Sequence, residues 1–145
     1  IKDLQASRGA AFGDYDNDGD IGILVSNEHA APCLLRNNSQ TGNQWLVVKV
    51  IGACPPFGSN RDGIGAKVKL TVTSVDTVKT YVSEVRSSSS YMSQNDLRIH
   101  FGLGSDVKHI HLLEVFWPSG IIDTIRDVIP NSLIQIREGE TESKL

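Results

Sequence analysis

Apolar and polar residues alternate with a period of two along much of the chain. The clearest run is residues 66–73, where Ala, Val and Leu alternate with Lys and Thr. Such alternation predicts a β-strand with one buried face. A second run follows at Thr77–Val85, and residues 74–77 are the expected hairpin connection. Further strands are predicted at Ile21–Ser26, Cys33–Arg36, Trp45–Ile51, Arg98–Gly102, His109–Trp117, Ile121–Val128 and Leu133–Arg137.

No stretch shows the i, i+3, i+4, i+7 spacing over the ten or so residues that a helix needs. Turn residues separate the predicted strands, as at Asn60–Gly65, Gly102–Gly104 and Pro118–Gly120. The sequence therefore predicts an all-β protein. Residues 86–96, which contain an SSSSY tract, lack a strand pattern and are expected to form a loop or an irregular edge.

The polar stretch NNSQTGNQ, residues 37–44, is rich in turn formers and predicts a linker. The preceding residues, 1–40, hold two or three strands, which is too little for an independent core. The following residues, 45–140, are enough for one antiparallel β-sandwich. We therefore expect a small N-terminal β-unit and a larger C-terminal sandwich domain.

The formal charge of the 145-residue chain is −3, and it is concentrated in one place. Asp14, Asp16, Asp18 and Asp20 lie within seven residues, and without them the charge would be +1. A near-neutral body argues against nucleic-acid binding, which needs a surplus of Lys and Arg. No apolar run reaches the ~20 residues that cross a bilayer, so no membrane insertion is expected. The chain begins at Ile1, as a mature product or a fragment would.

The acidic stretch DYDNDGD, residues 14–20, has the layout of a calcium loop. Carboxylates at positions one, three and five of a turning loop can point to one centre, and a glycine at position six permits the turn. The predicted metal ligands are Asp14, Asp16 and Asp18 through side chains and Asp20 through its backbone carbonyl. Position twelve is Val25 rather than Glu and the flanks are β-like, so the loop is not an EF-hand. The alternative is a solvated acidic turn without an ion.

Longer motifs add a family resemblance. RGAAFGDYDNDGDIGILVSN, residues 8–27, resembles the calcium-binding repeat of FG-GAP/VCBS β-propellers. NRDGIGAKV (60–68), YMSQNDLRIHFGLG (91–104) and VFWPSG (115–120) follow in an order that resembles the ASPIC/UnbV domain. That domain is similar to the C-terminal module of secreted FG-GAP propeller proteins of the cartilage acidic protein type. The resemblance runs from about Arg8 to Glu138.

The resemblance implies that residues 1–40 are a partial propeller blade with a Ca²⁺ loop and that residues 45–140 are the ASPIC/UnbV-like sandwich. It also implies an extracellular or secreted protein, or a periplasmic or cell-surface one in a bacterium. The family pattern has a further Asp at position nine of the loop, where this chain has Gly22. One ligand is therefore missing, and we expect a weak affinity on the order of 10⁻⁴ to 10⁻³ M. The segment Ala53–Ser59 resembles an insertion to which no role is assigned.

Other reactive side chains form no recognisable motif. Cys33 and Cys54 are compatible with one disulfide or with two separate thiols. His109 and His111 are two residues apart and share a strand face, as a metal pair would, but no Asp, Glu or Cys stands at ligand spacing beside them. A structural role is favoured for these histidines and for His100, and a core position for Trp117.

Three functional hypotheses follow. The first is a non-enzymatic, calcium-binding adhesion or scaffold module that binds a protein partner or the remainder of a propeller chain. The second is a self-assembling subunit, a homo-oligomer in which exposed strand edges of residues 1–40 pair with a neighbouring chain. The third is a hydrolase that uses an unrecognised carboxylate pair, for which Glu84 and Glu114 are candidates; the serines at 87–90 lack a GxSxG turn.

Overall fold

The computed structural model describes residues 6–74 and 77–140. Their regular secondary structure is entirely β-strand, which confirms the all-β prediction. The strands are β1 (Ser7–Gly13), β2 (Gly22–Asn27), β3 (Cys33–Leu35), β4 (Gln44–Ile51), β5 (Lys67–Ser74), β6 (Thr77–Glu84), β7 (Ile99–Gly104), β8 (His109–Phe116), β9 (Ile122–Val128) and β10 (Ser132–Arg137). Two residues of the predicted β5–β6 hairpin connection, Val75 and Asp76, lie outside the described residues.

The chain divides into two compact units. The first comprises the described residues up to Gln40 together with Ser87–Asp96, a segment that the sequence alone places inside the second domain. The second comprises Thr41–Arg86 and the described residues from Leu97 onward. None of the described residues forms a helix that is long and apolar enough to cross a membrane.

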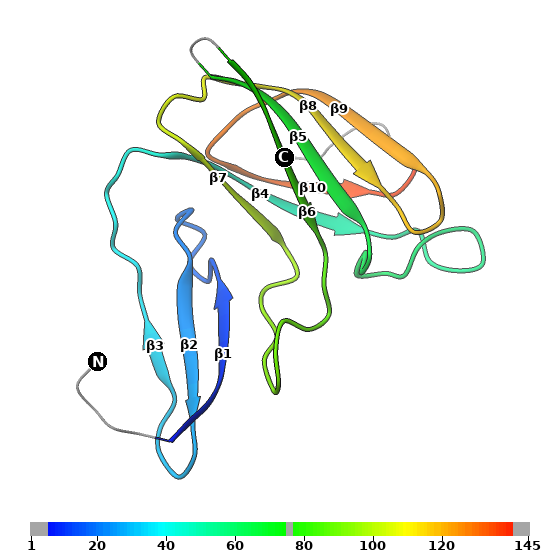
Figure 1. Cartoon of the computed structure of the whole chain (residues 1–145). Helices are drawn as coiled ribbons and strands as arrows, with labels where there is room; N and C mark the ends of the chain where they lie inside the picture. The colour runs from blue at the N-terminus through cyan, green and yellow to red at the C-terminus, as the bar shows by residue number, and fades with distance from the viewer. Residues whose placement is uncertain (1–5, 75–76, 141–145) are drawn as a thin grey trace. The chain divides into compact units, whose positions relative to one another are not determined.

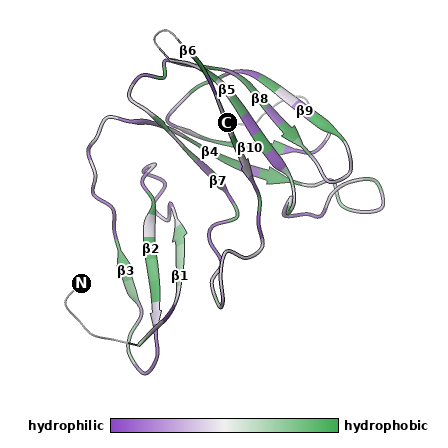
Figure 2. Cartoon of the chain, in the orientation of Figure 1, coloured by the Kyte–Doolittle hydropathy of each residue, from purple (hydrophilic) through white to green (hydrophobic). Residues whose placement is uncertain are grey.

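The first unit is built on a three-stranded antiparallel sheet in the order β1-β2-β3 (Figure 1). The sequence indicates β1 only as the β-like flank before the acidic loop, because its residues, SRGAAFG, are mostly small and show no strong alternation. It forms because β2 supplies a pairing template, with Ala11 opposite Leu24 and Phe12 opposite Ile23. Figure 2 shows that hydrophobic residues run through all three strands.

The segment Ser87–Asp96 lies along the outer edge of β1. The Ser93 hydroxyl accepts a hydrogen bond from the Ala10 N–H at 3.1 Å, and the side-chain Oδ1 of Asn95 accepts one from the Phe12 N–H at 3.1 Å. The Asp96 N–H donates to the Phe12 carbonyl at 2.9 Å. The segment thus satisfies backbone groups that an edge strand would otherwise leave open. Its only bridge is the isolated pair Ser90–Ser93, so the predicted irregular edge is confirmed.

The second unit is a β-sandwich of two sheets with the strand orders β10-β4-β7 and β6-β5-β8-β9 (Figure 1). Their inner faces share one core, which includes Leu46 and Val48 from β4 and Val68, Leu70 and Val72 from β5. The pairings are antiparallel except for β10 with β4, which is parallel. This pair departs from the antiparallel sandwich that the sequence suggests, because period two carries no information on strand direction.

Sequence-predicted turn and core residues of the second unit occupy the expected positions. Gly63 and Gly65 have φ of 65° and 90°, values that suit glycine. The Gly120 N–H donates to the Trp117 carbonyl at 3.0 Å and closes the predicted turn. The Trp117 ring belongs to the core, and its indole N–H donates to the buried Asp123 carboxylate at 2.7 Å.

A buried carboxylate joins three separate segments of the second unit. Glu138, which is 6% exposed, accepts hydrogen bonds from the Ala53 N–H at 2.8 Å and the Ser59 N–H at 2.6 Å. It also accepts from the hydroxyls of Ser59 and Ser119. A Cβ at Gly58 would lie 2.7 Å from a Glu138 carboxylate oxygen, so glycine is needed there. The Ala53–Ser59 segment, without a role at the sequence level, is therefore the loop that satisfies this carboxylate.

Burial raises the pKa of Glu138, but the hydrogen bonds from Ser119, Ala53 and Ser59 outweigh it and leave the pKa below its ordinary value of 4.5. A carboxyl whose pKa is lower in the folded than in the unfolded state stabilises the fold above the unfolded pKa. That contribution is lost as the pH falls through the folded pKa.

Replacing Glu138 by Gln places an amide NH₂ among donors, so we expect the free energy of unfolding to fall by about 2 kcal/mol at neutral pH. Urea titrations measure the loss. The difference from wild type should narrow as the pH drops below 4.5, because wild-type Glu138 becomes neutral as well. The exposed neighbour Glu140 provides the control Glu140→Gln, which should behave like wild type. An unchanged stability of Glu138→Gln at neutral pH would contradict this role of Glu138.

Candidate metal site

The acidic loop connects β1 to β2 and is organised by its first carboxylate. Asp14 is 2% exposed and accepts hydrogen bonds from the Asp18 N–H at 3.2 Å and the Gly19 N–H at 3.1 Å. Asn17 and Gly19 have φ of 58° and 90°, so the chain turns sharply between the two strands. Glycine adopts such a conformation without strain, and asparagine tolerates it better than most residues.

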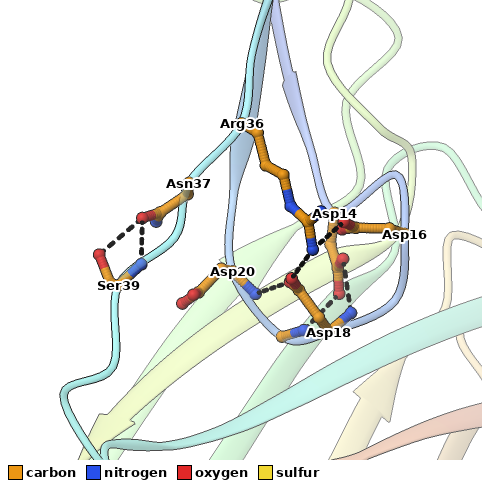
Figure 3. Close-up of polar contacts among 8 residues, drawn as sticks. Asp14, Asp16, Asp18, Asp20, Arg36, Asn37 and Ser39 are labelled. Atoms are coloured by element: carbon orange, nitrogen blue, oxygen red, sulfur yellow. Dashed lines mark hydrogen bonds and ion pairs between the residues drawn. The ribbon is translucent and has the colours of Figure 1, made fainter.

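Three of the four predicted ligands come together. Carboxylate oxygens of Asp14, Asp16 and Asp18 all lie within 4.8 Å of one another. Figure 3 shows the Asp20 side chain directed away from this group, while its N–H donates to the Asp18 carboxylate at 2.9 Å. Asp20 could therefore contribute only through its backbone, as the loop pattern suggests.

Arg36, which directly follows β3, lies at the acidic loop and is not among the residues that the sequence predicts for it. Its guanidinium lies 3.3 Å from an Asp16 carboxylate oxygen and 3.7 Å from one of Asp18 (Figure 3). The pairing of β2 with β3 brings Arg36 to the loop, because Leu35 lies opposite Ile23. The charge of Arg36 offsets part of the repulsion among the carboxylates.

The space at position nine of the loop is occupied by a side chain of the loop itself. A Cβ built on Gly22 would lie 3.0 Å from the Tyr15 ring and 3.3 Å from the Leu35 carbonyl oxygen. A side chain at this position would thus have to displace Tyr15. Ring carbons of Tyr15 therefore lie where a side chain at position nine would start, and they do not replace the missing oxygen ligand.

The donor set suits a hard divalent cation such as Ca²⁺, which prefers carboxylate and carbonyl oxygens. Asp16 and Asp18 are exposed enough to exchange Arg36 for an ion, whereas Asp14 is already held by two backbone N–H groups. A bound cation would therefore compete with the Arg36 guanidinium for the same two carboxylates. The loop can bind the ion, but it offers fewer side-chain oxygens than a complete calcium site does.

The predicted cysteines, the Glu84 and Glu114 pair and His100 do not form a second carboxylate centre within the part of the chain that the structure describes. Cys33 in the first unit and Cys54 in the second are both exposed, free thiols in the structure. Glu114 forms an ion pair with Lys69 at 2.8 Å and Glu84 lies 3.9 Å from Arg86, so each acid has its own basic partner. The His100 ring stacks on Trp45 with ring centroids 6.4 Å apart.

Two comparisons with known proteins bear on identity. A search of curated proteins found no match to the sequence. The family model described as ASPIC and UnbV matches residues 56–143, which covers most of the sandwich with its Gly63, Gly65 and Trp117 turns. Since this match spans more than half of the sequence, the chain belongs to the ASPIC and UnbV family.

Proposed function

We propose that the chain is a non-enzymatic module of an extracellular, secreted or periplasmic protein, in which Ca²⁺ stiffens the first unit for adhesion or assembly. The convergence of Asp14, Asp16 and Asp18 within 4.8 Å carries the proposal. Extracellular calcium modules bind in the range of ~10⁻⁴ to 10⁻³ M, which agrees with an incomplete ligand set. On this proposal the first unit is the last, partial blade of an FG-GAP-type propeller, and its partner is a protein or the remainder of such a chain.

The hydrogen bonding of the buried acids Glu138 and Asp123 supports a non-enzymatic role. A carboxyl that acts as a general acid or base near neutral pH normally has a raised pKa. The hydrogen bonds to Glu138 instead hold its pKa below the ordinary value, despite burial. Asp123 accepts from the Trp117 indole and from the Gly139 N–H at 2.9 Å, as a structural anchor would.

Calcium should raise the melting temperature of the protein, because a ligand that binds only the folded state stabilises it. At 10 mM Ca²⁺ the expected gain is about 1.4 to 2.7 kcal/mol for a Kd of 10⁻³ to 10⁻⁴ M. Thermal unfolding with Ca²⁺ and with chelator measures the gain. Asp16→Ala should remove it, and Asp62→Ala, at an exposed acid of the second unit, should keep it. Equal melting curves with Ca²⁺ and chelator would refute the calcium site.

Removal of Arg36 should strengthen calcium binding, since its guanidinium pairs with the carboxylates that would hold the ion. Two exposed ion pairs correspond to roughly a 2- to 5-fold gain in affinity. Calorimetric titration of Arg36→Gln against wild type measures the gain. Arg8→Gln is the matched control, because Arg8 pairs with Glu28 in the same sheet but away from the loop. A weaker affinity in Arg36→Gln would show that Arg36 supports the ion rather than competing with it.

Self-assembly is the second candidate function, and the surface of the first unit favours it. Leu24 of β2 and Leu34 of β3 lie opposite each other on one face of the sheet and are 47% and 53% exposed. Phe12 of β1 lies opposite Ile23, on the other face, and is 43% exposed. Both faces of the sheet thus present large apolar side chains, which a monomeric domain rarely leaves open. A second β-layer, from a neighbouring chain or from the rest of a propeller, would cover them.

If copies of the chain associate through the apolar faces of the β1-β2-β3 sheet, the wild type should form oligomers at micromolar concentration. Leu34→Asp should then be a monomer. Light scattering with Ca²⁺ and with chelator measures the mass. Val78→Asp, at an exposed apolar position of the second unit, is the control and should associate like wild type. A wild-type monomer that is insensitive to calcium would count against self-assembly and leave the first candidate standing.

A further inference from the structure

The four-stranded sheet of the second unit carries a cluster of two histidines, an aspartate and a threonine on its outer face. His109 and His111 come from β8, Asp127 from β9 and Thr73 from β5. The two Nδ1 atoms lie 3.0 Å apart, and the ring centroids lie 4.5 Å apart at an interplanar angle of 68°. The sequence spacing alone predicts that the two histidines lie close together. Asp127 and Thr73 join them because β9 and β5 are the two neighbours of β8 in the sheet.

A β-bulge directs the two imidazoles toward each other. In the pairing of β5 with β8, Val72 lies opposite Ile110 and Thr71 opposite Leu112, so His111 is an extra residue without a partner in that register. Ile110 and Leu113 both point into the core, which leaves His111 and Leu112 together on the outer side. Bulges commonly redirect side chains in this way beside functional sites.

The outer ring nitrogens are held by neighbouring strands. His109 Nε2 lies 3.2 Å from an Asp127 carboxylate oxygen, and His111 Nε2 contacts the Thr73 hydroxyl. The carboxylate keeps a proton on His109 Nε2, so neutral His109 has a bare Nδ1 that faces His111. Asp127 has φ of 57°, an uncommon conformation for a residue other than glycine.

Two imidazole nitrogens 3.0 Å apart must share a proton or a metal ion, because two lone pairs that face each other would repel. Without a metal, His111 Nδ1–H donates to His109 Nδ1, and the Thr73 hydroxyl donates to His111 Nε2. If His111 carries its proton on Nε2 instead, both Nδ1 atoms are free to bind an ion between them. An imidazole held by a carboxylate on its far side is the usual environment of a histidine metal ligand.

We propose that His109 and His111 bind a divalent transition-metal ion through their Nδ1 atoms, with Asp127 and Thr73 as the groups that orient the two rings. At Zn–N-type distances of about 2.05 Å, nitrogens 3.0 Å apart subtend an angle of about 94° at the ion. That angle suits two adjacent positions of square-planar or octahedral coordination, so Cu²⁺ and Ni²⁺ are favoured over tetrahedral Zn²⁺. Water completes the coordination, since His109 is 44% and Asp127 76% exposed.

Titration with Cu²⁺ tests the site, with binding followed by calorimetry and nitrogen coordination by electron paramagnetic resonance. One ion with two nitrogen ligands is expected for wild type. His109→Ala and His111→Ala should each lose the two-nitrogen signal, and Asp127→Asn should weaken binding by about 10-fold or more. His29→Ala is the matched control, because His29 is exposed and lies in the other unit, and it should bind like wild type. Asp16→Ala should also bind like wild type, because the acidic loop offers only oxygen.

NMR of the imidazole groups keeps the test decisive if a histidine variant fails to fold. Substoichiometric Cu²⁺ added to the wild-type protein should broaden the resonances of His109 and His111 before those of His29 and His100. Uniform broadening of all four histidines, or an unchanged two-nitrogen signal in folded His111→Ala, would overturn the proposal. In that case the cluster is a metal-free hydrogen-bond chain from Thr73 to Asp127.

Discussion

The register of β5 is the constraint on which the second unit depends. Val68, Leu70 and Val72 are completely buried on its inner face, and a slip of one residue would carry all of them to the surface. This strand pairs with β6 on one side and β8 on the other, so its register fixes both neighbours. β6 in turn leads into the segment that covers the edge of β1, and β8 carries the bulge at His111. The position of the His111 bulge therefore depends on the burial of three aliphatic side chains of β5.

Asp14 in the first unit and Glu138 in the second are buried carboxylates that follow the same physical rule, as does Asp123. Hydrogen bonds replace the hydration that Asp14 and Glu138 lose: the Asp18 and Gly19 N–H groups donate to Asp14, and two N–H groups with two hydroxyls donate to Glu138. Each acid thereby shapes a loop around itself. In the acidic loop this leaves Asp16 and Asp18 as the carboxylates that can exchange partners, and Arg36 is the partner in the structure.

Several elements were predictable because their causes are local. Alternation marked β5 and β6, short β-type runs marked the other strands from β2 to β10, and glycines marked the turn at Gly63 and Gly65. The spacing of Asp14, Asp16 and Asp18 predicted their convergence, since a tight loop brings every second side chain to one side. β1 was expected only as a β-like flank of the acidic loop, without bounds, because its small residues carry almost no hydrophobic pattern. The segment 87–96 gave no sign of its role, because side-chain hydrogen bonds to another strand's edge leave no periodicity.

The sequence by itself determined the all-β class, the apolar inner faces, the family and the three converging carboxylates. These depend on neighbours within a few residues, where strand and turn geometry are nearly fixed. Only the tertiary structure decided which groups surround them: Arg36 at the acidic loop, the parallel pairing of β10 with β4, and Asp127 beside His109. Such pairings join residues that are distant in the chain. They are selected by the free energy of burying whole sheet faces, which no short stretch of sequence contains.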